Sequence, residues 1–399
     1  TSHPPSVSSF TATPGVCIAA TASGSGKTTI ATGLIAALAS RMKVAPFKVG
    51  PDYIDPGYHS IASGCVGRNL DSVLCGNNLI GPLYRHGSQH ADIAVVEGVM
   101  GLFDGRISDG AGSTADIAAT LGVPILLIVD VRGMSQSVGA VVRGFATTRS
   151  DVRIAGVILN KVGSDRHAAV CREAVEAEGI PVVGSIPRQH DIEVPSRHLG
   201  LVTAVEHGEA ALKAIQSMEK LIEQTCDIDR ISALADCSYT GPMWDPTTVV
   251  NKVGSPTIAM AGGPAFTFGY AEHRELLEAA GATVVVFDPL QDALPTCDGL
   301  IIPGGFPSSK YAAIRIVPED NPVHLTAIQY LPSPAVQLGY CRVGTLEMLA
   351  LRPHFRIQRK PIGYAPQAFR ILLHAAGVMA SLNICPLSSE RGTQLVIQS

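Results

Sequence analysis

The stretch GVCIAATASGSGKTT, residues 15–29, decides the fold of this chain. Its first six residues predict a buried strand, and the apolar spacing of residues 27–42 predicts a helix directly after a turn of small residues. Such a turn lets main-chain N–H groups surround a phosphate, and the helix N-terminus adds partial positive charge. We therefore expect Lys27 to reach the β- and γ-phosphates of a nucleotide and the Thr28 hydroxyl to bind Mg²⁺. The predicted nucleotide-binding residues of this turn are Ser23, Gly24, Ser25, Gly26, Lys27, Thr28 and Thr29.

After residue 29 the chain alternates short apolar runs with helical stretches. The runs are rich in Val, Ile and Leu and nearly continuous, which is typical of strands buried on both faces of a sheet. Alternating strands and helices with right-handed crossovers predict an α/β fold with a mainly parallel sheet. Strands are expected at 44–49, 91–96, 124–131 and 153–159, and helices at 135–148 and 167–178.

The character of the sequence changes between residues 238 and 255, where Pro and Gly interrupt a stretch without periodicity. We interpret residues 238–255 as a linker that joins a nucleotide-binding domain, residues 15–237, to a smaller α/β domain, residues 256–399. The Ser/Thr/Pro-rich residues 1–14 predict a disordered tail and lack the pattern of a signal peptide. In the second domain, strands are expected at 257–261, 283–287 and 299–302, and a helix at 270–280.

Composition restricts the class of protein. Hydrophobic residues make up 46% of the 399 residues and charged residues 16%, which indicates a globular rather than a disordered chain. A net charge of −4 without a basic run argues against nucleic acid as a partner, and no apolar run approaches the ~20 residues that span a bilayer. Nine scattered cysteines without a CxxC pair argue against a disulfide framework or a zinc site, so a cytoplasmic location is expected.

Two acidic segments follow predicted strands, FKVGPDYIDPGYH at 47–59 and VVEGVMGLFDG at 95–105. Ligands of open parallel sheets bind outside the carboxyl ends of the strands, so both segments are expected beside the phosphate loop. Carboxylate and hydroxyl oxygens are the ligands that Mg²⁺ prefers. Pro-Asp and Asp-Gly pairs also form ordinary turns, and that alternative stays open for each segment taken alone.

Together these segments resemble one family. The chain is similar to the cobyrinic acid a,c-diamide synthases, in particular the actinobacterial-type enzymes that act on hydrogenobyrinic acid. That family joins a P-loop domain related to dethiobiotin synthetase to a class I glutamine amidotransferase domain, and it does not require glycine where this chain has Thr21. The resemblance is carried by SGSGKTT (23–29), FKVGPDYIDPGYH (47–59), RNLDSVL (68–74), VVEGVMGLFDG (95–105), GSTADIA (112–118), RIAGVILNKVGSDRH (153–167), FTFGYAEHRELLEAAGA (266–282) and GLIIPGGFP (299–307).

The resemblance implies ATP-dependent amidation of the a and c carboxylates of a corrinoid acid in cobalamin biosynthesis. ATP would phosphorylate a carboxylate, and ammonia, free or drawn from glutamine, would attack the acyl phosphate; such a transfer depends on positioning and charge neutralisation. ATP and Mg²⁺ are the implied cofactors, and a homodimer stays open. The residues matched to the family are Thr28, Asp52 and Glu97 for the metal, Lys48, Asp55 and Asp104 for catalysis, Tyr53, Asp55, His59 and Asp104 for the substrate, and Asn160 for the adenine edge.

The second domain departs from the family. A glutamine amidotransferase needs a Cys nucleophile, a His that activates it and N–H groups that stabilise an oxyanion. Residues 303–307 resemble the oxyanion segment, and Cys341 is the best candidate nucleophile, but bulky Arg342 and Val343 follow it where small residues are expected. Asn383 stands at the position of the catalytic His and cannot take a proton near neutral pH. We therefore predict a degraded amidotransferase-like domain and free ammonia as the working nitrogen source.

Three other interpretations remain. The chain could be the related enzyme that amidates the remaining corrin side chains, although the two acidic segments favour the a,c-diamide type. It could be a P-loop ATPase of the partitioning or metal-chaperone type that acts as a binding switch, but such a switch needs no second domain with the PGGFP segment at 303–307. It could also be a decayed product with a folded first domain.

Overall fold

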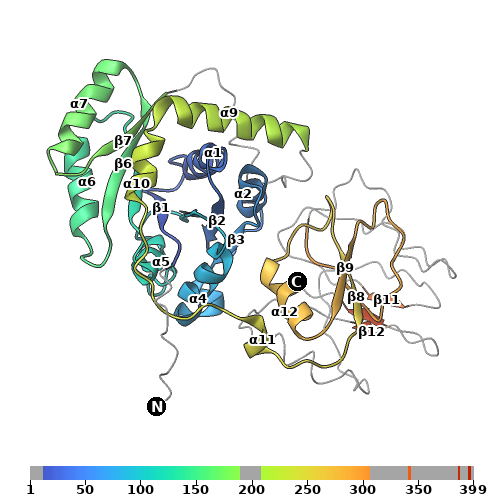
Figure 1. The fold of residues 1–399 in the computed structure, drawn as a ribbon. Helices are drawn as coiled ribbons and strands as arrows, with labels where there is room; N and C mark the ends of the chain where they lie inside the picture. The colour runs from blue at the N-terminus through green and yellow to red at the C-terminus, as the bar shows by residue number, and fades with distance from the viewer. Residues whose placement is uncertain (1–11, 189–207, 306–339, 343–384, 387–393, 397–399) are drawn as a thin grey trace, which may run out of the picture. The chain divides into compact units, whose positions relative to one another are not determined.

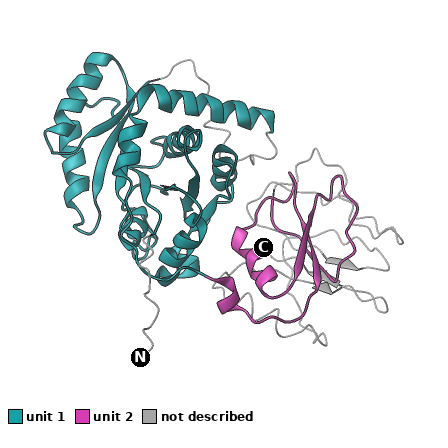
Figure 2. Ribbon diagram, in the orientation of Figure 1, with its two compact units in different colours: residues 1–244 teal, residues 245–399 magenta. Residues whose placement is uncertain are grey.

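The structure is a computed structural model of residues 1–399, and it describes residues 12–188, 208–305, 340–342, 385–386 and 394–396. The chain divides into two compact units, Thr1–Trp244 and Asp245–Ser399 (Figure 2). The division falls inside the stretch 238–255, which the sequence predicts to be a linker.

The first unit contains a seven-stranded sheet in the order β3-β2-β4-β1-β5-β6-β7, and every pairing is parallel. This confirms the predicted α/β fold with a parallel sheet after a phosphate loop. β1 lies between β4 and β5, so the loop that follows it emerges at the centre of the sheet (Figure 1). The strands are β1 (Gly15–Ala20), β2 (Val44–Val49), β3 (Arg68–Leu70), β4 (Ile93–Glu97), β5 (Ile125–Asp130), β6 (Ile154–Val162) and β7 (Val182–Pro187).

Helix α1 (Lys27–Ala39) packs between the sheet and helix α9 (Glu209–Thr225). It is apolar around most of its circumference because both sides are covered, and Ile30, Leu34 and Leu38 belong to the main core. A Cβ atom at Gly33 would lie 2.5 Å from the carbonyl oxygen of Met218, so glycine permits the close approach of α9. The other helices of this unit are α2 (Asp55–Ser63), α3 (Ser72–Cys75), α4 (Asn77–Ser88), α5 (Thr114–Leu121), α6 (Ser137–Thr147), α7 (Asp165–Glu176) and α10 (Ile228–Leu234).

Residues 238–244 pack against the first unit. The indole ring of Trp244 is 7% exposed and meets the His86 ring edge-on, with centroids 4.9 Å apart. Its main-chain N–H donates to the carbonyl of Pro82 in α4 at 3.0 Å. The first half of the predicted linker is therefore part of the folded first unit.

The second unit contains a four-stranded sheet in the order β12-β10-β8-β9, in which β10 and β12 are antiparallel. The predicted strands and helix of residues 257–301 are confirmed to within two residues at each end. The elements are α11 (Pro246–Val249), β8 (Thr257–Ala261), α12 (Ala271–Ala279), β9 (Thr283–Phe287), β10 (Gly299–Ile301), β11 (Tyr340–Arg342), β12 (Cys385–Pro386) and β13 (Gln394–Val396).

Candidate active site

The phosphate loop has a backbone conformation that requires glycine at two positions. Gly24 has φ +74° and Gly26 has φ +91°, both in the left-handed region that other residues rarely adopt. The Ser25 hydroxyl donates to the carbonyl of Ala22 at 2.8 Å and holds the turn closed. Gly26 immediately precedes α1, whose first N–H groups have no partner within the helix and suit a phosphate.

Asn160, near the end of β6, supports this loop from behind. Its side-chain Nδ2 donates to the Ser25 carbonyl at 2.9 Å, and its Oδ1 accepts from the N–H of Lys161 at 2.9 Å. A Cβ atom at Gly26 would lie 2.8 Å from this Nδ2, so the loop and the amide are in close contact. The structure thus gives Asn160 a role in shaping the phosphate loop, and its contact with an adenine ring remains a prediction.

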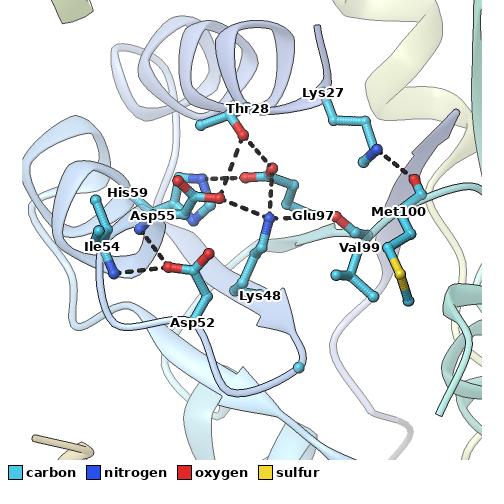
Figure 3. Close-up of polar contacts among 12 residues, drawn as sticks. Lys27, Thr28, Lys48, Asp52, Ile54, Asp55, His59, Glu97, Val99 and Met100 are labelled. Atoms are coloured by element: carbon cyan, nitrogen blue, oxygen red, sulfur yellow. Dashed lines mark hydrogen bonds and ion pairs between the residues drawn. The ribbon is translucent and has the colours of Figure 1, made fainter. Parts of the chain in front are cut away.

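Lys27 is buried, and its ammonium donates to the main-chain carbonyl of Met100 (Figure 3). Met100 itself has φ +47°, a strained conformation for a side chain of this size. Burial lowers the pKa of Lys27, and the nearby positive charge of Lys48 lowers it further. The hydrogen-bond partner of the Lys27 ammonium is a neutral carbonyl. A bound triphosphate would bring negative charge to this ammonium.

Three side chains from different elements meet beside Thr28 (Figure 3). The Thr28 hydroxyl lies 2.7 Å from Oε1 of Glu97 at the end of β4, and 3.3 Å from Oδ2 of Asp55 at the start of α2. Lys48 extends from β2 and places Nζ 2.7 Å from both of these carboxylate oxygens. The β2, β4 and α2 segments are thus brought together as the sequence predicts from strand ends.

The charges in this cluster stabilise one another. Although burial favours the neutral acid, the charge of Lys48 and the contact with His59 lower the pKa of Glu97 to about 2. Burial and the neighbouring Glu97 raise the pKa of Asp55. Burial alone would lower the pKa of Lys48, but Glu97 and Asp55 together raise it. Glu97 and Lys48 are therefore a charged pair, and Asp55 is the cluster's most easily protonated acid.

Asp52 has a different position from the one expected of a metal ligand beside Thr28. Its Oδ1 accepts the main-chain N–H groups of Ile54 at 2.7 Å and Asp55 at 3.0 Å, and so holds the chain at the start of α2. Of the two aspartates, Asp55 is the one that places a carboxylate oxygen near the Thr28 hydroxyl, at 3.3 Å. The sequence alone does not show which of the two acids lies near Thr28. The answer depends on α2 beginning at Asp55, and the segment around it, with Pro and Asp, is also typical of a turn.

The prediction that His59 contacts the substrate does not agree with its position in this structure. The imidazole ring is completely buried, with Nε2 2.8 Å from Oε2 of Glu97. His59 follows Asp55 by four residues on α2, so both side chains lie on the helix face that meets Glu97. The i,i+4 spacing of Asp55 and His59 predicts that both side chains share one face, provided that α2 is recognised as a helix.

The other two predicted substrate residues lie closer to solvent. Asp104 is exposed, and its Oδ2 accepts the N–H of Gly101 at 3.0 Å, which shapes the loop after β4. Tyr53 is half-buried and precedes α2. Both belong to segments that also carry the buried cluster, and their contact with a substrate remains a prediction.

In the second unit, Cys341 lies in β11, which pairs with β13 in antiparallel register, Cys341 opposite Leu395. The main chain of Phe268 donates to the carbonyl of Gly304 at 2.9 Å, so part of the PGGFP segment is joined to the loop after β8. Asn383 lies outside the described residues. The activity of this unit is therefore still a sequence-based prediction.

The oxygen atoms of Thr28, Glu97 and Asp55 are of the types that bind Mg²⁺. Within the described part of the chain, no group of three or more His, Cys, Asp and Glu side chains is arranged to hold a metal by itself. No helix in the described ranges has the length and apolar character needed to cross a bilayer.

Comparison with known proteins gives consistent matches. Residues 16–202 match the CobQ/CobB/MinD/ParA nucleotide binding domain family, also described as CbiA. A hydrogenobyrinate a,c-diamide synthase of Mycobacterium bovis is 56% identical over 308 residues, which cover 75% of this chain and 67% of the relative.

Two further relatives extend the comparison. A hydrogenobyrinate a,c-diamide synthase of Streptomyces coelicolor is 49% identical, with 75% of this chain and 69% of the relative covered. A cobyrinate a,c-diamide synthase of Picrophilus torridus is 41% identical, with 73% of this chain and 67% of the relative covered. All three are named for the same type of reaction on a corrinoid acid.

Proposed function

This chain belongs to the family of cobyrinate and hydrogenobyrinate a,c-diamide synthases, and we propose that it converts the a and c carboxylates of such an acid into amides with ATP. The observation that supports this most directly is the cluster of Thr28, Lys48, Asp55 and Glu97 beside the phosphate loop. The relatives at 56% and 49% identity are named for hydrogenobyrinate, which favours that acid as the acceptor.

The reaction has two balanced steps. A carboxylate oxygen of the acceptor bonds to the γ-phosphorus of ATP as the bond to the β-phosphate oxygen breaks, which gives an acyl phosphate and ADP. Ammonia then attacks the acyl carbon, phosphate leaves, and the nitrogen loses a proton. Both steps depend on the alignment of reactants and the neutralisation of phosphate charge.

Lys27 and the cluster residues have distinct roles in this scheme. Lys27 leaves the Met100 carbonyl to contact the terminal phosphates, where its positive charge lowers the repulsion between ATP and the acceptor carboxylate. Thr28, Glu97 and Asp55 would hold Mg²⁺, which would neutralise phosphate charge on the nucleotide.

Lys48 and the exposed Asp104 complete the scheme. Lys48 keeps the acid pair compensated when no nucleotide is present. Asp104, together with the half-buried Tyr53, orients the acceptor or takes a proton from the incoming ammonium.

The chain works in the cytoplasm with free ammonia as nitrogen donor. Cys17, Cys65, Cys171, Cys226, Cys237 and Cys297 are free thiols, which suits a reducing compartment. The amidotransferase-like unit, with Asn383 at the expected position of the activating His, contributes little glutaminase activity.

Incubation with ATP, Mg²⁺, an ammonium salt and either hydrogenobyrinic or cobyrinic acid tests the proposal by mass spectrometry. Two successive products are expected, each of which replaces an OH group with NH₂, with one ADP released for each. ATP hydrolysis that is independent of the corrinoid acid, without an amide product, would contradict the proposal and favour a binding switch of the partitioning type.

A further inference from the structure

The two carboxylate oxygens of Glu97 face different partners (Figure 3). Oε1 lies 2.7 Å from the Thr28 hydroxyl and 2.7 Å from the Lys48 ammonium. Oε2 lies on the other side, 2.8 Å from Nε2 of His59. The whole side chain of Glu97 is buried, so water cannot replace either partner.

Helix α2 supplies both sides of this arrangement. Asp55, at its start, contacts Lys48 and Thr28 on the Oε1 side. His59, one turn later, approaches from the Oε2 side. The imidazole is fully buried, and Nδ1, Nε2 and Oε2 of Glu97 all lack an aligned hydrogen bond among the described residues. The 2.8 Å approach of Nε2 to Oε2 is therefore the polar contact in the structure that accounts for a histidine at this place.

We propose that His59 is a positioning residue that fixes the rotation of the Glu97 carboxylate, so that Oε1 faces the Thr28 hydroxyl and the cation brought by the nucleotide. Without the imidazole, Oε2 loses this 2.8 Å contact inside the protein, and a buried acceptor left with no partner costs about 1–3 kcal/mol. The carboxylate then gains by turning Oε2 towards Lys48, which moves Oε1 away from Thr28. The inference rests on the proposed binding of Mg²⁺ with ATP.

This role predicts an effect on Mg²⁺ and not on nucleotide binding in general. The polar contacts of the phosphate loop and Lys27 run to Ala22 and Met100 and not to His59. Partners of metal-binding side chains typically change metal affinity 10–100-fold when they are removed, which sets the scale of about tenfold or more expected here. A histidine that only fills the core would instead change stability without changing the response to Mg²⁺.

Three variants of the full chain separate these possibilities. His59→Leu keeps the apolar volume and removes the donor. His59→Gln carries a side-chain N–H at about the reach of Nε2, whereas His59→Asn is shorter and reaches only about as far as Nδ1. Tyr58→Leu is the matched control, because Tyr58 is 1% exposed on the same helix but packs in a core cluster with Ala36 and Met218.

The measurement is the affinity for a non-hydrolysable ATP analogue by calorimetry, without Mg²⁺ and over a series of Mg²⁺ concentrations. His59→Leu is expected to bind the Mg²⁺-free analogue like wild type but to need about tenfold more Mg²⁺ for tight binding. His59→Gln should respond nearly as wild type does, and Tyr58→Leu should lose thermal stability with an unchanged Mg²⁺ response.

An unchanged Mg²⁺ response in His59→Leu would overturn the inference, and so would an equal shift in Tyr58→Leu. If His59→Leu does not fold, the pair His59→Gln and His59→Asn decides the matter, since equal responses in both would show that the contact at Nε2 is not needed. A wild-type protein whose nucleotide affinity ignores Mg²⁺ would overturn the proposed metal site itself. The two failures can be told apart. If the metal site is wrong, wild type itself shows no Mg²⁺ response; if only the role of His59 is wrong, wild type and His59→Leu show the same response.

Discussion

The Lys48 ammonium lies 2.7 Å from Oε1 of Glu97, and both side chains are almost completely buried. Asp55 shares this ammonium at the same distance. One buried cation therefore compensates two carboxylates that extend from different elements, β4 and α2. Removing one member of a buried ion pair leaves an uncompensated charge, which is far more damaging than the loss of a surface pair.

Lys48→Met is expected to lower the free energy of unfolding by about 3–5 kcal/mol, because Glu97 and Asp55 would face each other without a counter-charge. Combining it with Glu97→Gln should cost less than the sum of the two single changes, since the variants share one interaction. Denaturant unfolding measures both effects. The control is Lys213→Met, whose exposed pair with Glu209 on α9 should be worth about 0.3–0.5 kcal/mol. Additive costs for Lys48 and Glu97 would contradict the prediction.

A second prediction concerns Gly98, directly after Glu97. A Cβ atom there would lie 2.6 Å from Cγ2 of Thr114 and 3.0 Å from the carbonyl of Ile18, so β4 and the start of α5 must separate. Gly98→Ala should lower stability by about 1–3 kcal/mol and reduce ATP turnover, because Glu97 moves with its neighbour. Gly144→Ala in α6 is the matched control, with open space around the added methyl group. It should be neutral or stabilise the helix by up to about 1 kcal/mol. Equal effects at the two sites would refute the steric argument.

The sequence predicts the architecture of the first unit well, because the signals for it are local. The continuous apolar runs locate every strand of the sheet except β3 and β7, and the glycine-rich turn fixes the start of α1. Short β3, Arg68–Leu70, lacks the length of an apolar run. Helix α9 was not predicted either, although its buried residues follow a helical period; it lies beyond the alternation used to assign the earlier elements.

The site was predicted as a group of segments rather than as a set of contacts. Strand ends bring Lys48 and Glu97 together, as expected. The start of α2 decides which acid of DYIDPGYH lies near Thr28. A helix that began one turn earlier would place Asp52 where Asp55 now lies. The Met100 carbonyl as partner of Lys27 carries no sequence signal, because any residue has a carbonyl and only the backbone conformation aims it.

A third prediction uses the chain's single tryptophan. Trp244 is buried against α4 at the end of the first unit, so its fluorescence should report the unfolding of that unit. Trp244→Ala is expected to lower the stability of the first unit by about 3–5 kcal/mol, measured by circular dichroism. Met243→Ala, at the exposed neighbouring position, should change stability by less than about 0.5 kcal/mol. Similar small effects for both would mean that residues 238–244 are a linker throughout.

A fourth prediction concerns the pH response of the second unit. Burial lowers the pKa of His273 in α12 from 6.5 to about 4, and its Nε2 has no hydrogen-bond partner among the described residues. Because the folded pKa lies below the unfolded one, folding favours the neutral ring. Its contribution is complete above pH 6.5 and is lost as the pH falls from 6.5 towards 4. The loss is on the order of 3 kcal/mol at most. His273→Leu should flatten this dependence in denaturant unfolding at about pH 7 and about pH 5; an unchanged slope would contradict the assignment.

The last prediction concerns the nitrogen donor. Cys341 lies within the short strand β11, and the sequence prediction places Asn383 where a glutaminase needs a His to activate its thiol. An ammonium salt should therefore support amide formation much faster than glutamine, and Cys341→Ala should leave the ammonia-driven rate unchanged. Cys297→Ala, at a half-buried thiol of the same unit, controls for the loss of a cysteine side chain. Both rates are measured with saturating ATP and the corrinoid acid. Glutamine-driven rates equal to the ammonia-driven ones, and abolished only in Cys341→Ala, would mean that the second unit has kept its nucleophile and found another base.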